Sequence, residues 1–448
     1  MKKFGGANVL TPAARVRGGV KVRHNKNTAI LPAVRIPIPD KVVLPMSQHI
    51  GAPCVPTVKV GDTVAVGQVI GDSDAFVSCP IHASISGTVT AIGDVKLANG
   101  RMSKAVTIQS DGEMRLWEGI KPPVVTNRQE LLAAVRASGL VGLGGAGFPT
   151  HVKIGFDESK GVDTLVVNAA ECEPYITVDS RECVDNTDNI FKGIDALMKY
   201  LGFKKCVIAV EDNKPASIRF LSNFAKNYDN VDVMVLESKY PQGAEKMMVL
   251  SATGRKVAPG KLPADAGCVV MNVASVAFIG RYLETGKPLI SRSMTVDGTA
   301  IAVPKNVRVP IGISVQEVVN FCGGFSSEPY KIIAGGPMMG AAIVRTDVPV
   351  LKSNNAILAF ADDKSKIKPE RACIHCGRCA NGCPIGLAPL LIVDAVKTKN
   401  ADDLEKLGVN VCMECGSCSY SCPSGLQLVQ YMRMGKQILK EEAAKKNG

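Results

Sequence analysis

Short apolar runs separated by turn residues fill residues 42–110 of the chain. The segments VVLPMS, PTVKVGD, VAVGQVIG, ISGTVTAIG and KAVTIQS each end at Gly, Asp or Ser, which is typical of strands joined by turns. Residues 128–138 (RQELLAAVRAS) instead space their apolar side chains as a helix does, and they lead into a glycine-rich segment at 142–150. The pattern predicts an all-β module followed by a different kind of domain.

Beyond residue 160 the β and α patterns alternate. Strand-like runs TLVVNAA, KCVIAVE, VDVMVLE and CVVMNVA are separated by helical stretches near 183–201, near 214–227 and from Gly243. Alternation at this pitch predicts a parallel sheet with helices on both faces. Residues 290–345 return to short strands around one helix, and the chain ends in an amphipathic segment from Leu426.

Composition narrows the class of protein. The 448 residues are 46% hydrophobic and 21% charged, as in a folded globular protein long enough for about three domains. The longest apolar stretch, Cys268–Gly280, is shorter than the ~20 residues of a membrane span, and residues 1–39 lack the apolar core of a signal peptide. We therefore expect neither secretion by a cleavable signal nor a membrane span.

The net charge of +12 is concentrated at the N-terminus, where residues 1–39 carry eight Lys or Arg and no acid. Such a basic leader predicts either a docking arm or a solvated tail. Nucleic acid is disfavoured as its partner, because aromatic residues form only 5% of the chain and none interleaves with the basic residues as a stacking motif.

Two cysteine runs near the C-terminus repeat the spacing C-x2-C-x2-C-x3-C-P. In two-cluster ferredoxins the fourth cysteine of each such run ligates the other cluster. Structural zinc is the alternative, although zinc sites usually separate two C-x2-C pairs by a dozen or more residues. The predicted ligand sets are Cys373, Cys376, Cys379 and Cys422 for one 4Fe–4S cluster, and Cys412, Cys415, Cys418 and Cys383 for the other.

A glycine loop and an acidic strand end are candidates for a nucleotide or flavin site. Gly142 to Gly147 match G-x-G-x-x-G, but a helix precedes the loop and Phe148-Pro149 follow it, unlike the dinucleotide fingerprint. The strand that ends at Asn168 is followed by the acids of the segment 171–173, at the sheet edge where α/β proteins bind ligands. A solvated strand end is the alternative for these acids.

Four segments carry a resemblance to a known family. GLGGAGFPTHVK at 142–153, NAAECEP at 168–174, YPQGAE at 240–245 and MNVAS at 271–275 resemble the flavin-binding motifs of the 51-kDa NADH-oxidising subunit of respiratory complex I. With the N-terminal β module and the two cysteine runs, the chain from about residue 17 is similar to the RnfC family of the Rnf ion-translocating oxidoreductases. The resemblance implies noncovalent FMN on which NADH stacks, and no catalytic side chain beyond the cofactors.

The same resemblance assigns site residues. It implies FMN contacts at Gly142, Gly144, Gly145, Gly147, Lys153, Asn168, Gly243 and Asn272. It implies NADH contacts at Phe148, Glu173 and Glu245. This chain has Ala170 where the complex I protein has an acid, and Ala244-Glu245 where it has two glutamates. Fewer acids around the flavin would change its potential or the affinity for nucleotide.

The β module of residues 40–112 looks like a lipoyl or biotinyl carrier domain, a flattened barrel of two hairpin sheets. Such a domain carries its cofactor on a lysine at a hairpin tip. The corresponding position lies near Phe76, and the sequence has no lysine between Lys59 and Lys96. We therefore expect a docking or structural element without a covalent group.

The expected fold class is α/β and multidomain. The expected units are a basic leader (1–39), a lipoyl-like β barrel-sandwich module (40–112), a Rossmann-like FMN- and NADH-binding parallel-sheet domain (113–289), a β-grasp module of SLBB type (290–345), a connecting segment (346–365) and an α-helical two-cluster ferredoxin domain with a C-terminal helix (366–448).

The function that the resemblance implies is electron entry from NADH, through FMN and two 4Fe–4S clusters, into a membrane-bound NADH:ferredoxin oxidoreductase that moves ions. Its partners would be the membrane subunits and a ferredoxin-like subunit, and its location the cytoplasmic face of the membrane. The alternatives are the cobalamin reductase of propanediol-utilising microcompartments, which shares this module order, and a nonenzymatic iron–sulfur relay or scaffold.

Overall fold

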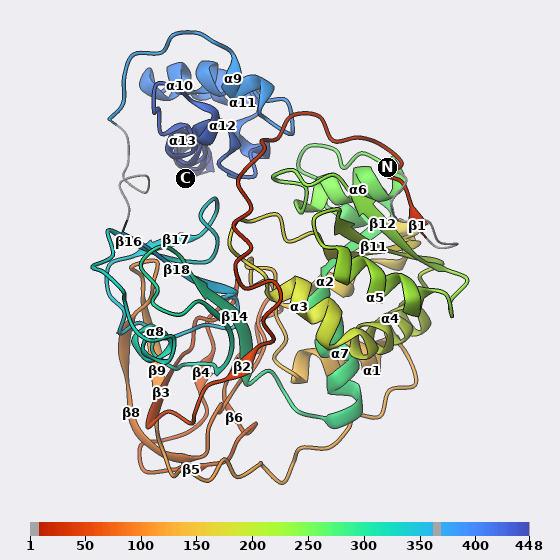
Figure 1. The fold of residues 1–448 in the computed structure, drawn as a ribbon, viewed down its shortest axis with the longest axis vertical. Coiled ribbons are helices and arrows are strands. Elements are labelled where there is room, and N and C mark those ends of the chain that lie inside the picture. The colour runs from red at the N-terminus through yellow and green to blue at the C-terminus, as the bar shows by residue number, and fades with distance from the viewer. Residues whose placement is uncertain (1–8, 362–368, 448) are drawn as a thin grey trace.

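The computed structural model describes residues 9–361 and 369–447. Figure 1 shows a helical domain at the top, an α/β domain beside and below it, and two β-rich modules at the opposite end. The N-terminal segment runs across this face from the α/β domain to the β-rich part. The multidomain α/β class expected from the sequence is confirmed.

The α/β domain is built on a parallel sheet. Its strands are, in spatial order, β1 (Val9–Leu10), β12 (Val231–Leu236), β11 (Lys205–Glu211), β10 (Thr164–Ala169) and β13 (Cys268–Asn272). Leu165 and Val167 pack into one core and Val166 into another, so β10 is buried on both faces. This explains its continuous apolar run. The helices are α1 (Arg128–Ala137), α2 (Thr150–Ile154), α3 (Val178–Asp185), α4 (Thr187–Leu201), α5 (Pro215–Ala225), α6 (Glu245–Thr253) and α7 (Val273–Thr285).

The first β module consists of two small sheets. One has the order β3 (Lys41–Pro45), β9 (Met102–Ser110), β8 (Gly87–Lys96) and β5 (Thr63–Val64), and the other has β4 (Val55–Pro56), β6 (Val69–Asp72) and β7 (Ile81–His82). Phe76 stands exposed in the loop between β6 and β7, with 77% of its surface accessible. The backbone of this loop is anchored to the α/β domain, because Arg136 donates to Asp72 at 2.8 Å and to the Ser73 carbonyl.

The second β module is a mixed sheet. Its order is β17 (Ala341–Ile343), β16 (Lys331–Ala334), β18 (Ala356–Phe360), β14 (Ser291–Asp297), β15 (Lys305–Pro310) and β2 (Val34–Arg35), and helix α8 (Val315–Phe321) packs on it. Residues 346–365, expected to be a connecting segment, therefore supply β18 between β14 and β16, and 362–368 lie outside the described residues. The fully apolar strand AILAF is buried, which explains its place inside the sheet.

The C-terminal domain repeats one helical unit. Helix α9 (Arg378–Asn381) packs on α12 (Ser417–Ser421), and α10 (Pro389–Lys397) packs on α13 (Leu428–Asn447). Helix α11 (Ala401–Lys406) joins the two halves and contacts both long helices. The repeat of the cysteine spacing is thus a repeat of structure.

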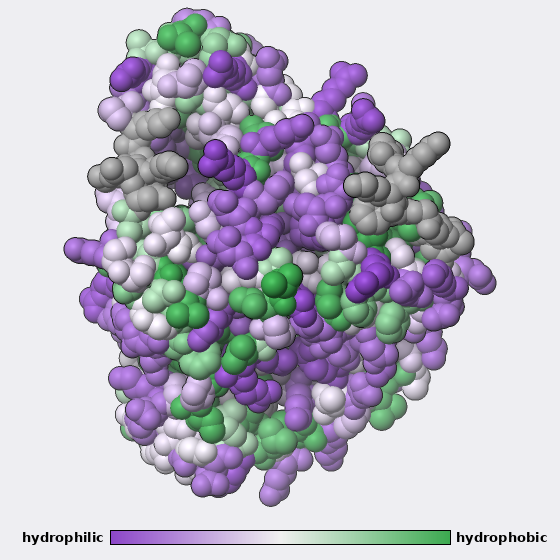
Figure 2. All heavy atoms as spheres, in the orientation of Figure 1, coloured by the Kyte–Doolittle hydropathy of each residue, from purple (hydrophilic) through white to green (hydrophobic). Residues whose placement is uncertain are grey.

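Residues 9–36 form an extended segment, here called the strap, that contacts three domains (Figure 1). Its start pairs with β12, Gly19 donates to the Gly382 carbonyl in the helical domain, and its end pairs with β15. The expectation of a solvated tail is wrong for these residues. Figure 2 shows mostly hydrophilic residues on the face that the strap crosses, and its Arg15, Arg17, Lys21 and Arg23 are exposed.

Candidate functional site

The glycine loop of residues 142–147 presents bare backbone to open space. Gly142 N donates to the Phe148 carbonyl at 2.8 Å, so the loop is closed on itself. Gly145 has a φ of +111°, and a Cβ added to it would meet no atom of the described structure within 4 Å. Backbone of this kind can approach a phosphate or a flat ring closely.

The ends of two neighbouring strands face this loop. Asn168 on β10 and Asn272 on β13 are direct neighbours in the sheet. Asn168 Nδ2 donates to the Gly243 carbonyl at 2.8 Å, and a Cβ on Gly144 would lie 3.3 Å from the Asn272 side chain. The structure thus brings together four of the predicted flavin residues, contributed by four separate segments of the chain.

Asn272 also begins helix α7. Its Oδ1 accepts a hydrogen bond from Ala274 N at 3.0 Å, and its Nδ2 donates to Asp179 Oδ2 at 2.7 Å. Burial raises the pKa of Asp179 to about 6, while the Asn272 amide opposes that rise. The N-terminus of a helix favours anions, so this edge of the sheet suits the phosphate of a flavin nucleotide.

Lys153 and Glu245, predicted from different motifs, contact each other. The Lys153 ammonium donates to a Glu245 carboxylate oxygen and, at 2.9 Å, to the Val270 carbonyl. Both side chains are partly exposed, at 30% and 45%. The pair lies at the start of helix α6, where a bound anion would compete with Glu245 for Lys153.

Glu173, a predicted NADH contact, is bound by the second β module. Its carboxylate accepts hydrogen bonds from Met338 N and Met339 N, both at 3.0 Å. Burial raises the pKa of Glu173 to about 7, although the two N–H groups favour the ionised form. Phe148, the third predicted contact, ends the glycine loop and is partly buried. A solvated strand end is therefore the wrong description of Glu173.

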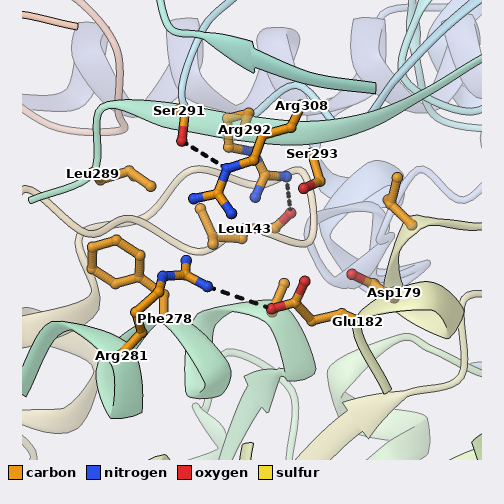
Figure 3. A pocket seen from close by; sticks show the side chains of 12 residues that line it. Leu143, Asp179, Glu182, Phe278, Arg281, Leu289, Ser291, Arg292, Ser293 and Arg308 are labelled. Atoms are coloured by element: carbon orange, nitrogen blue, oxygen red, sulfur yellow. Dashed lines mark hydrogen bonds and ion pairs between the residues drawn. The ribbon is translucent and has the colours of Figure 1, made fainter. Parts of the chain in front are cut away.

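Sequence motifs gave no sign of Arg292, which supports the glycine loop from behind. This buried side chain on β14 donates from Nη2 to the Leu143 carbonyl at 2.9 Å. It lines a small pocket of about 30 Å³. Figure 3 shows Arg308 near it and Arg281 directed at Glu182. A lone arginine in a β segment has no motif, so only the fold could identify it.

The predicted ligands of the first cluster surround one cavity. Cys373, Cys376, Cys379 and Cys422 line a space of about 190 Å³ whose other walls are largely apolar. Cys422 comes from the other half of the repeat and lines the same cavity as the three cysteines of the first run, as the predicted crossing requires. Nowhere in the described ranges do three potential ligands converge on a single ion. A cubane is larger than an ion and occupies a cavity, so these residues fit a 4Fe–4S cluster.

The second group, Cys412, Cys415, Cys418 and Cys383, is more enclosed. Burial, with the neighbouring thiols Cys412, Cys415 and Cys383, raises the pKa of Cys418 to about 12. A metal that binds such a group takes up thiolates and removes this cost, since coordination deprotonates the sulfur. The residues present therefore fit a 4Fe–4S cluster, whose positively charged core binds thiolates.

Both cysteine groups contain the same backbone turn, in which an N–H group points at a cysteine sulfur. His375 and Glu414 occupy the same place in the two runs, and both have a positive φ, at 54° and 56°. Each turns its N–H toward the cysteine two residues before it, with N to Sγ distances of 3.4 Å to Cys373 and Cys412. Hydrogen bonds to sulfur are one means by which a protein sets the potential of an iron–sulfur cluster.

The second group adjoins the flavin motifs. Tyr240, from the segment YPQGAE, is buried and donates from its hydroxyl to the Cys415 carbonyl at 2.7 Å. A side chain at Gly416 would lie 3.1 Å from the carbonyl oxygen of Met338, whose N–H binds Glu173. The first group instead opens outward, with Ile374 66% exposed. A flavin-type α/β fold next to two four-cysteine groups defines a flavin and iron–sulfur electron-transfer protein.

Comparison with known families agrees with that class. Residues 135–281 match the Nuo51 FMN-binding domain, 14–113 the RnfC barrel sandwich hybrid domain, 294–342 the SLBB domain and 365–442 the 4Fe-4S dicluster domain. The chain therefore carries an FMN-binding domain and a domain for two 4Fe–4S clusters.

Curated relatives identify the family. The chain is 44% identical to a subunit of the Na⁺-translocating ferredoxin:NAD⁺ oxidoreductase complex of Acetobacterium woodii, over 84% of this chain and 86% of the relative. It is 45% identical to the corresponding subunit of the proton-translocating ferredoxin:NAD⁺ oxidoreductase complex of Clostridium ljungdahlii, over 84% and 83%. The chain belongs to the RnfC family of Rnf complex subunits. Both relatives are named as subunits of an oxidoreductase complex.

Among solved structures, the chain is similar to the NAD⁺-reducing NiFe hydrogenase in its H2-reduced state. It is 18% identical, with a TM-score of 0.49, over 70% of this chain and 63% of that chain. Within the described residues, no helix is both long enough and apolar enough to span a membrane.

Proposed function

We propose that the chain is the NADH-oxidising electron-entry subunit of a membrane-bound, ion-translocating NADH:ferredoxin oxidoreductase. The observation that carries the proposal is the junction at Tyr240. There the flavin motifs of the α/β domain meet the second cysteine group through a buried hydrogen bond to Cys415. An arrangement of this kind suits electron transfer between a flavin and an iron–sulfur cluster.

The residues proposed to hold FMN come from the glycine loop, from helix α2 and from the strand ends and turn beside them. These are Gly142, Gly144, Gly145, Gly147, Lys153, Asn168, Gly243 and Asn272. FMN, when bound, exchanges electron pairs with nicotinamide and single electrons with iron–sulfur clusters. The protein's own part is to supply open backbone at Gly145, an ammonium group at Lys153 and a helix N-terminus at Asn272. Phe148, Glu173 and Glu245 are proposed to contact NADH beside it.

We assign Cys412, Cys415, Cys418 and Cys383 to the cluster on the flavin side, and Cys373, Cys376, Cys379 and Cys422 to the cluster on the outer side. The buried Tyr240 contact supports the first assignment. The exposure of Cys376 and Ile374 beside the larger cavity supports the second, because an electron partner must come close to its cluster.

We further propose a peripheral position on the cytoplasmic face of the membrane. Both relatives are named as subunits of ion-translocating complexes. The proposed contacts are membrane subunits and a ferredoxin-like subunit of the same complex. The exposed Arg15, Arg17 and Arg23 of the strap offer a basic surface for such docking, or for anionic lipid beside it.

An anaerobic NADH titration of the full chain, reconstituted with FMN and iron–sulfur clusters, tests the proposal. The flavin should bleach on NADH addition, and the clusters should then become reduced as seen by EPR. Gly145→Val should abolish flavin binding, because a side chain would enter the open space over the loop. Gly161→Val is the matched control, since Gly161 also has a positive φ and open surroundings but lies outside the loop.

Two outcomes would contradict the proposal. A wild-type protein that binds no flavin after reconstitution, while dithionite still reduces its clusters, would favour the iron–sulfur relay or scaffold. Flavin loss in both glycine variants would mean that backbone strain, rather than occupation of the flavin space, explains the effect of Gly145→Val.

A further inference from the structure

The loop of residues 171–176 has a strained backbone that needs external support. Glu171 and Tyr175 have φ values of +49° and +68°, although neither is a glycine. Residues with side chains adopt this region at a cost, and they persist there only where surrounding contacts hold them. The loop follows Asn168 and carries Glu173, so its shape sets where the Glu173 carboxylate lies.

The strap supplies that support through one side chain. Lys26 Nζ donates to the carbonyl oxygens of Glu171 at 2.9 Å, Glu173 at 2.8 Å and Ile176 at 2.5 Å. The Glu171 carboxylate lies 3.9 Å away, and only 15% of the Lys26 side chain is exposed. Three acceptors require three N–H donors, which only the protonated ammonium group has.

The strap is itself fixed on both sides of Lys26. Upstream, Val20 exchanges backbone hydrogen bonds with Tyr240, at 2.7 and 3.0 Å. Downstream, the buried Thr28 bonds to Thr177 at 2.6 Å, and Asn306 donates to the Thr28 carbonyl at 2.9 Å. A further bond runs from Tyr175 N to the His24 carbonyl at 2.9 Å. Lys26 is therefore held in place rather than free to leave the loop.

We propose that Lys26 is a positioning residue for the nucleotide side of the flavin site, where its ammonium group holds residues 171–176 in the conformation that presents Glu173. This inference rests on the proposed function. Among the described residues, the side chain of Lys26 bonds to groups that follow Asn168, so it acts on the nucleotide contact more than on the flavin contacts. The Lys26 ammonium group belongs to the N-terminal strap and not to the glycine loop or the strand ends proposed to hold the flavin.

The test compares Lys26→Met with Lys21→Met in the full, reconstituted chain. Lys21 lies on the same strap, but its side chain is exposed. NADH-dependent reduction of ferricyanide gives KM and kcat, and flavin absorbance gives FMN content. Lys26→Met should raise the KM for NADH on the order of tenfold, with kcat and FMN content retained, as expected for loss of charge-assisted hydrogen bonds that act on binding. Lys21→Met should behave as wild type.

Two further variants keep the test decisive if Lys26→Met does not fold. Lys26→Arg keeps the charge and the donors, whereas Lys26→Gln keeps two donors without the charge. The KM for NADH should rise from wild type to Arg to Gln. Equal KM values in all three, or an equal rise in Lys21→Met, would overturn the role of Lys26. A wild-type chain that NADH does not reduce would instead overturn the proposed function, so the two failures are distinguishable.

Discussion

Replacing Glu173 by glutamine tests whether the ionised carboxylate of this residue contributes to the reaction with NADH. The ionised carboxylate accepts two backbone hydrogen bonds, from Met338 and Met339. A glutamine has one acceptor oxygen, and its NH2 group would face the other N–H donor. The glutamine side chain therefore resembles the protonated glutamate in shape and charge. The substitution removes only the negative charge and the second acceptor oxygen of the ionised form.

The size of the effect follows from the pKa of Glu173, which burial raises to about 7. Roughly a tenth of the carboxyl groups are ionised at pH 6 and about nine-tenths at pH 8. One hydrogen bond to a charged group is worth ~1.5–3 kcal/mol, or about tenfold at the lower end. We take flavin reduction by NADH to be about ten times slower with neutral Glu173 than with ionised Glu173, and the variant to react at the slower rate. The rate of the wild type should then exceed that of the variant about ninefold at pH 8 and about twofold at pH 6.

Rapid-mixing measurements of flavin bleaching by NADH at pH 6 and pH 8 provide the assay. Glu118→Gln is the control, because Glu118 is an exposed residue between β9 and α1. FMN content should be the same in all three proteins. An equal ratio at both pH values would refute the titration of Glu173, and unaltered kinetics at both would remove Glu173 from the site.

The same pKa affects stability with a definite sign. The folded protein holds the Glu173 proton more tightly than the unfolded chain, whose carboxyl has the ordinary value of 4.5. The contribution of Glu173 to the free energy of unfolding therefore falls as pH rises from about 4.5 through about 7. The glutamine variant should lack this part of the pH dependence in thermal unfolding.

Three further predictions concern the cysteine groups, the domain junction and the β module. Cys422→Ala should damage the cluster of the first group and leave the second largely intact; iron analysis and EPR would decide, and loss confined to the second would refute the crossing. Tyr240→Phe leaves the buried Cys415 carbonyl without its donor, and should destabilise the junction by ~1–3 kcal/mol, seen as faster local hydrogen exchange. Intact mass should detect no covalent lipoyl or biotinyl group; an added mass within residues 60–95 would contradict this.

Local pattern was enough to predict the parts of the protein that are built locally. The alternation of apolar runs predicted the parallel sheet, because a strand buried on both faces needs a continuous apolar run and its helices need a periodic one. The spacing of each cysteine run is likewise a local property, since the positive-φ turns at His375 and Glu414 lie within the runs. The individual flavin contacts came instead from the resemblance of four short motifs to a known family, and they stay predictions.

The contacts between domains were decided only by the tertiary structure. Lys26 meets carbonyl groups about 145 to 150 positions away along the chain, and no pattern within the strap distinguishes it from the exposed Lys21. The β18 strand, the hydrogen bonds of Glu173 and the contact between Tyr240 and Cys415 are of the same kind. Each of these features depends on how the domains pack against one another. In the sequence such a contact is a single polar residue whose partner lies far away along the chain, so no local pattern predicts it.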